Sequence, residues 1–184
     1  MKILEIQALN VLFNTPIGNV YAVNNASFTL NNNETVALVG ETGCGKSVIA
    51  NTIMRLLPQN AKVSGRILYK DKDILKASEV ELEKIRQQEI AIVFQNSSLS
   101  LNPLYTIGNQ ISEPLMIHKK MNKKDALHKT KKLLKTMGFQ DPSKSANMYP
   151  YQLSGGMNQR ALLSVAMTLN PSIIIADEPT KGLD

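Results

Sequence analysis

The segment GETGCGKS at residues 40–47 constrains the fold more than any other part of the chain. It follows an apolar run at residues 36–39 and precedes an apolar-periodic segment at residues 48–57, which Pro58 ends. A continuous apolar run is typical of a strand buried on both faces, and the spacing of the next segment is typical of a helix. Strands that alternate with helices, here and later in the chain, predict an α/β domain with a largely parallel sheet.

The spacing G-x-x-x-x-G-K-S predicts a phosphate-binding loop, or P-loop. Glycines let the backbone curl so that successive N–H groups and the helix N-terminus face a phosphate. The Lys46 ammonium would neutralise the β and γ phosphates of a nucleotide, and the Ser47 hydroxyl would hold Mg²⁺. The residues predicted to contact the nucleotide are Gly40, Glu41, Thr42, Gly43, Cys44, Gly45, Lys46, Ser47 and Val48.

Two adjacent acids follow a second apolar run, in the sequence IIIADE at residues 173–178. A P-loop site needs a carboxylate beside its Mg²⁺, and Asp177 fits that role. Glu178 is predicted to orient and polarise the attacking water. Two acids could merely cap a surface loop, but the P-loop upstream makes that the weaker interpretation.

A third motif, LSGGM at residues 153–157, begins a helical segment. Ser154, Gly155 and Gly156 would present a hydroxyl, backbone donors and a helix N-terminus to an anion. Ser-Gly-Gly is also ordinary linker sequence, so the motif gains weight from its position just upstream of the acidic strand.

The remaining segments predict strands in the first third and helices in the middle. Asn122 with Asp125 is expected to cap one helix and Gly138 to end it. The sequence predicts strands at residues 2–13, 26–30, 65–69, 90–94 and 172–176, and helices at 106–118, 122–137 and 154–169. Residues 96–157 are interpreted as a helical insertion.

Composition and charge narrow the class of protein. The chain has 184 residues, which is the length of one domain. Its residues are 43% hydrophobic and 20% charged, which is typical of a globular protein. A single cysteine excludes an internal disulfide and suits a reducing compartment. The net charge of +6 is largely local, because eight lysines fall between Lys119 and Lys135. Their apolar neighbours at helical spacing favour a solvated helix face over a binding patch for nucleic acid, anionic lipid or phosphate.

The ordered motifs GETGCGKS, Gln95, LSGGM, IIIADEP and TKGLD resemble the ABC ATPase family over nearly the whole chain. The resemblance implies a P-loop NTPase core with an N-terminal antiparallel β subdomain, formed by residues 1–95 and 158–184. It assigns residues 96–157 to a helical subdomain that carries the LSGGM motif. It also implies ATP hydrolysis with ATP and Mg²⁺ as cofactors, and a second cassette that pairs head to tail with this one.

The same resemblance assigns roles that the residues alone do not. Gln95 matches the family's Q-loop glutamine, which contacts Mg²⁺ or the attacking water. Asp184 matches the D-loop aspartate that reaches across the dimer. Phe13, at the end of the first strand, matches the aromatic residue that stacks on adenine, in preference to Tyr21.

The segment after Gln95, NSSLSLNPLYTIGNQISEPL, resembles the peptide and nickel importer branch of the family. That branch implies two permease subunits, an extracytoplasmic solute-binding protein and a location at the cytoplasmic face of the membrane. The alternative is a soluble ABC ATPase acting on nucleic acid or ribosomes. It is disfavoured because the stretch between Gln95 and Leu153 is too short for a long coiled coil, and no nucleic-acid partner is expected.

The chain stops at Asp184, before the position where the family places its switch histidine. His118 and His128 precede the LSGGM motif, so neither is expected to replace it. We therefore expect a C-terminally truncated domain that hydrolyses ATP poorly.

Overall fold

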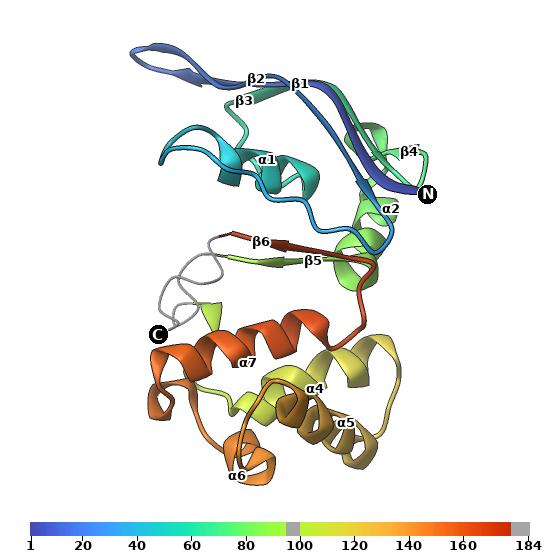
Figure 1. Ribbon diagram of the computed structural model, residues 1–184, viewed down its shortest axis with the longest axis vertical. Coiled ribbons are helices and arrows are strands. Elements are labelled where there is room, and N and C mark those ends of the chain that lie inside the picture. The colour runs from blue at the N-terminus through green and yellow to red at the C-terminus, as the bar shows by residue number, and fades with distance from the viewer. Residues whose placement is uncertain (95–99, 178–184) are drawn as a thin grey trace. The chain divides into compact units, whose positions relative to one another are not determined.

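The computed structural model describes residues 1–94 and 100–177 of the chain (Figure 1). The chain separates into two compact units, residues 1–83 and 84–184. The predicted division differs from this one, because it places residues 1–95 and 158–184 in the core and residues 96–157 in a helical subdomain. The predicted division stays a prediction. None of the described helices is long and apolar enough to cross a membrane.

A four-stranded antiparallel sheet forms the first unit, with the strands in the order β2-β1-β3-β4. The strands are β1 (Lys2–Thr15), β2 (Gly18–Asn31), β3 (Ala61–Tyr69) and β4 (Lys72–Asp73). The predicted antiparallel strands are confirmed. β2 begins earlier than residue 26 because a tight turn, closed by a 2.7 Å hydrogen bond from the Thr15 hydroxyl to the Gly18 carbonyl, lets pairing start at once.

Close packing of β1 against β3 requires a glycine at position 65. Gly65 has φ of 102°, and a Cβ there would lie 2.5 Å from the backbone oxygen of Ala8. The register between β1 and β3 shifts between Gln7 and Asn10, where Ala8 also has a positive φ. This bulge leaves Ile6, Val11 and Ile67 fully buried in the core of the unit.

The helix α1 (Lys46–Ile53) starts where the P-loop motif predicts but ends four residues before residue 57. Arg55 has φ of 49°, in the left-handed region, and its backbone N–H bonds to the Thr52 carbonyl. A residue in this conformation ends a helix regardless of the apolar pattern that follows it. The Arg55 side chain then donates to the carbonyl of Ala77 at 2.6 Å, next to the short helix η1 (Ile74–Lys76).

The prediction of a buried strand at residues 36–39 is wrong. Val36, Leu38 and Val39 are 38%, 41% and 93% exposed, and no strand is formed there. A β-ladder needs a neighbouring strand, and the first unit, which the structure describes in full, provides none for this segment. An apolar run indicates that a segment can be buried, but it does not supply the partner.

The second unit contains a parallel pair, β5 (Ile90–Val93) and β6 (Ile173–Ala176). Both strands are confirmed where the sequence predicted them. Backbone bonds from Ser172 to Glu89 and from Asp177 to Val93 extend the pairing at its two ends. The mixed α/β fold class, with an antiparallel sheet and a parallel sheet, is therefore confirmed.

Helices make up most of the rest of this unit, and their predicted caps are present. Asn122 accepts a hydrogen bond from the Asp125 N–H at 3.0 Å, and Gly138 has the positive φ of a helix stop. The elements are η2 (Ile85–Glu89), α4 (Ile107–His118), α5 (Lys123–Thr136), α6 (Pro142–Ala146), η3 (Pro150–Gln152) and α7 (Gly155–Met167), and α2 (Glu79–Lys84) precedes them. Of these helices, α4, α5, α6 and α7 share a core that is centred on Ile107, Ile111, Leu134 and Ala161.

Candidate functional site

The loop at residues 40–45 has the backbone that the glycine pattern predicts. Gly43 and Gly45 have φ of 89° and 93°, which only glycine adopts at no cost. A Cβ on Gly45 would lie 2.2 Å from the carbonyl oxygen of Ala22, so glycine is the only residue that fits there. α1 begins directly after this turn, which leaves its first N–H groups available to an anion.

Lys46 folds its side chain back over the loop. Its Nζ donates to the carbonyl oxygens of Gly40 and Glu41, both at 2.7 Å, and lies 3.5 Å from Cys44 Sγ. The ammonium therefore lies within hydrogen-bond distance of the loop backbone, and its contact with the β and γ phosphates stays a prediction. Ser47 is exposed, so its hydroxyl is available as an oxygen ligand.

Asp177 lies at the end of β6, where its N–H bonds to the Val93 carbonyl at 2.9 Å. β5 and β6 run parallel, so their carboxyl ends meet at the same edge of the sheet. Gln95 and Glu178 follow these two strand ends in the sequence but lie outside the described residues, as does Asp184. Their assigned roles stay predictions.

The oxygen donors of Ser47 and Asp177 fit Mg²⁺, which prefers hydroxyl, carboxylate and phosphate oxygens. Ser47 belongs to the first unit and Asp177 to the second. Each donor is partly or fully exposed within its own unit. The chemistry of the set therefore suits the ion, and the joint coordination stays a prediction.

The LSGGM motif forms the start of α7. Leu153 is buried in the helical core, while Ser154 and Gly155 are exposed. The Ser154 hydroxyl caps the helix by accepting from the Met157 N–H at 3.3 Å. A Cβ on Gly155 would meet nothing within 4 Å among the described residues, so their packing does not require a glycine there.

Phe13 and Tyr21 point to opposite faces of the first sheet. Phe13 pairs with Val20, and Tyr21 pairs with Leu12, so the alternation of side chains along β1 separates the two rings. Phe13 is half-buried and Tyr21 is 73% exposed. A nucleotide bound on one face of this sheet can therefore stack on only one of the two rings. That this ring is Phe13 stays a prediction.

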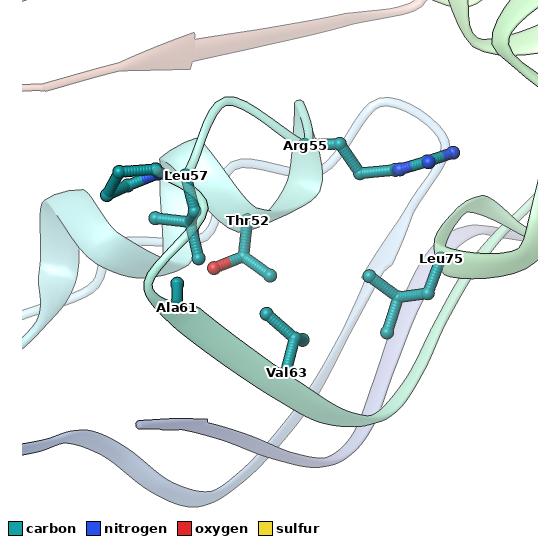
Figure 2. Close-up of a pocket in the computed structure, with 7 residues that line it drawn as sticks. Thr52, Arg55, Leu57, Ala61, Val63 and Leu75 are labelled. Carbon is teal, nitrogen blue, oxygen red and sulfur yellow. The ribbon is translucent and has the colours of Figure 1, made fainter. Parts of the chain in front are cut away.

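A separate pocket is formed by residues of α1, β3, η1 and the segment between α1 and β3, and it does not include the P-loop (Figure 2). Its polar groups are already engaged: Thr52 donates to the Val48 carbonyl, and Arg55 donates to the Ala77 carbonyl, both at 2.6 Å. The lining residues are Thr52, Arg55, Leu57, Pro58, Ala61, Val63 and Leu75. The pocket is lined by both polar and apolar groups and lies apart from the loop that is predicted to bind phosphate.

Gln110 is a positioning residue that the sequence did not reveal. Its amide nitrogen donates to the Asn102 and Tyr105 carbonyls at 2.9 and 3.0 Å, and its amide oxygen accepts from the Asn102 N–H at 2.8 Å. These bonds fix the turn before α4, which presents Leu104 and Tyr105 to solvent. A single glutamine in a helical segment gives no signal of such a role.

Alkylation of Cys44 with N-ethylmaleimide should block ATP binding. The thiol is exposed at the loop beside Lys46, so an adduct would crowd the place predicted for the phosphates. Labelling is specific because the chain has no other cysteine. The measurement is ATP affinity before and after labelling. Unchanged affinity of the fully labelled protein, or labelling that saturating ATP does not slow, would contradict this placement of the loop.

Comparison with known proteins gives the same family as the motifs. The model of the ABC transporter family matches residues 23–181. The dipeptide transport ATP-binding protein DppD of Bacillus subtilis is 47% identical over 185 residues, which cover 100% of this chain and 55% of that protein. The oligopeptide transport ATP-binding protein OppD of Escherichia coli is 40% identical over 182 residues, covering 99% and 54%. The chain spans about half the length of the curated relatives it matches.

The solved structures that resemble this chain are also ABC proteins. The dimeric post-hydrolysis structure of the ATP-binding cassette MJ0796 bound to ADP and Pi has a TM-score of 0.86 and 29% identity, covering 98% of this chain and 76% of that one. Another match is cbiO1 from Clostridium perfringens, part of an ABC transporter complex, with a TM-score of 0.80, 27% identity, and coverage of 100% and 68%. The chain belongs to the ABC transporter family.

Proposed function

We propose that this chain is the ATP-binding and ATP-hydrolysing part of a subunit that energises a peptide importer. The observation that carries the proposal is the loop in which Lys46 folds over the carbonyls of Gly40 and Glu41, next to the glycine-only turn at Gly45. Relatives named for dipeptide and oligopeptide transport support peptide as the cargo. Nickel-type cargo is the alternative within the same importer branch.

In the proposed mechanism the residues of this chain divide binding from chemistry. Lys46 and the loop N–H groups would bind the β and γ phosphates of ATP, and Ser47, Asp177 and Gln95 would hold Mg²⁺. Bound Mg²⁺ neutralises phosphate charge. Glu178 orients the attacking water and accepts its proton.

The proposed working state contains a second cassette paired head to tail with this one. Ser154, Gly155 and Gly156 would face the γ-phosphate held by that partner, and Asp184 would reach across the dimer. The open space around Gly155 supports this role, because it leaves room for a ligand to approach the start of α7. Phe13 is the proposed adenine-stacking residue.

The turn before α4 is the proposed contact with one of the two permease subunits at the cytoplasmic face of the membrane. Leu104 and Tyr105 are 81% and 56% exposed, and Gln110 holds the turn that carries them. Two neighbouring exposed side chains, on a turn that hydrogen bonds fix, support this contact. A solute-binding protein would deliver cargo on the other side.

Cross-linking tests this contact. In a Cys44→Ala background, Leu104→Cys should cross-link to a cytoplasmic loop of a permease subunit in membranes that contain the assembled transporter. The matched control is Val80→Cys, an exposed position in the first unit, which should give no such product. Equal cross-linking at the two positions would contradict the proposal, and salt-sensitive binding of the intact protein to DNA or RNA would favour the soluble alternative.

A further inference from the structure

Nearly all of the excess positive charge of the chain lies on and beside α5. Residues 119–137 contain eight lysines and one acid, Asp125. The rest of the sequence then contains thirteen basic and fourteen acidic residues, so it is close to neutral. The positive charge is therefore a property of one element and not of the whole surface.

The helix geometry places part of this charge in one exposed row. Ala126, Thr130 and Leu134 form the buried face of α5, which packs on α4, α6 and α7 (Figure 1). The exposed residues Lys124, His128, Lys131 and Lys135 follow the spacing i, i+4, i+7 and i+11. This spacing keeps side chains on one side of a helix, over a length of roughly 16 Å. Lys132 is also exposed, beside this row. We call the surface formed by Lys124, Lys131, Lys132 and Lys135 the α5 lysine face.

Among the described residues, the charge of the α5 lysine face is not balanced by ion pairs. In the part of the chain that the structure describes, no ion pair involves any of its four lysines. Asp125, the only acid of the helix, is hydrogen-bonded to the cap residue Asn122. Lys131 and Lys135 are four residues apart, a spacing at which like charges destabilise a helix.

This pattern differs from that of an ordinary solvated helix face, which the sequence alone favoured for this segment. Solvated faces commonly alternate Glu and Lys at four-residue spacing, which stabilises the helix. The α5 lysine face does the opposite, because it gathers one sign of charge at the expense of helix stability. An external anionic partner would offset that repulsion.

The residue types favour a membrane surface over a nucleic acid. Base recognition in nucleic acids commonly uses arginine forks and stacking aromatic rings, and α5 contains neither. Lysine is a compact point charge, and clusters of about four to eight basic residues bind anionic phospholipid headgroups. Ile117, which is 61% exposed just before Lys119, adds an apolar side chain of the kind that enters a lipid interface.

We propose that the α5 lysine face docks on the anionic phospholipid headgroups of the membrane. The attraction is electrostatic and weakens as salt rises. It would hold the helical part of the cassette beside the permease between catalytic cycles. This inference rests on the proposed function only in placing the protein at a membrane.

Sedimentation with vesicles tests the proposal on the intact protein. We expect binding to vesicles of phosphatidylglycerol with phosphatidylcholine, and much weaker binding to phosphatidylcholine alone. The triple variant K124Q/K131Q/K135Q should lower the affinity for the anionic vesicles by roughly 10- to 100-fold at low salt. The charge-preserving variant K124R/K131R/K135R should retain it, which separates loss of charge from loss of fold.

A matched control removes the same charge elsewhere. K62Q/K72Q/K76Q changes three exposed lysines of the first unit and should bind anionic vesicles like the wild type. Equal losses in the two triple variants would show an effect of net charge alone and would overturn the proposal. So would equal binding of the wild type to the two kinds of vesicle, or tighter binding to RNA than to anionic vesicles.

ATP binding, measured on the same preparations, keeps this inference separate from the proposed function. Vesicle binding through the α5 lysine face in a protein that does not bind ATP would leave this inference standing and reject the proposed function. ATP binding without preference for anionic vesicles would do the reverse.

Discussion

Replacing Glu178 with glutamine should leave ATP affinity close to that of the wild type while turnover falls by roughly 10²- to 10⁴-fold. The magnitude is that of a lost general base. Binding is spared because the proposed role of Glu178 concerns only the attacking water, whereas phosphate charge is met by Lys46 and the loop. The measurements are phosphate release and equilibrium ATP binding on the intact protein.

The control for Glu178→Gln is Asp71→Asn, the same change from carboxylate to amide in an exposed turn. Asp71 has φ of 66°, which asparagine tolerates, so this variant should hydrolyse ATP like the wild type. Normal turnover in Glu178→Gln would remove the role assigned to that acid.

Replacing Lys46 with alanine should instead weaken ATP binding itself, by roughly 10- to 150-fold. That range corresponds to about 1.5–3 kcal/mol for one hydrogen bond to a charged group. The structure gives the reason, because the Lys46 ammonium lies over the loop, 2.7 Å from the Gly40 and Glu41 carbonyls, and bound phosphate would meet it there. The measurement is a titration with a fluorescent ATP analogue.

Lys62→Ala, an exposed lysine on β3, is the control for the loss of one positive charge. It should bind ATP like the wild type. Equal affinity in Lys46→Ala and Lys62→Ala, in proteins with the same thermal unfolding midpoint, would show that Lys46 is not a phosphate ligand.

The sequence predicted the features whose cause is local. The positive φ at Gly43 and Gly45 follows from the glycines themselves, and the start of α1 follows from the motif. The cap of α5 depends on a hydrogen bond between Asn122 and Asp125, three residues apart. Such contacts are fixed by short segments, so a sequence pattern identifies them.

Some features that depend on partners elsewhere in the chain were missed. The apolar run at residues 36–39 gave no information about a neighbouring strand, and the first unit provides none. α1 ends early because Arg55 turns into the left-handed region and bonds to Ala77, which lies 22 residues away in the sequence. The role of Gln110 likewise depends on Asn102, eight residues before it.

The central claim is that the loop at residues 40–47 binds ATP. Calorimetric titration of ATP with Mg²⁺ into the intact protein tests it most directly. The proposed P-loop predicts saturable binding at one site per chain that Lys46→Ala weakens and Cys44 alkylation blocks. Folded wild-type protein that shows no saturable binding at millimolar ATP would contradict the claim, and so would binding that neither change at the loop affects.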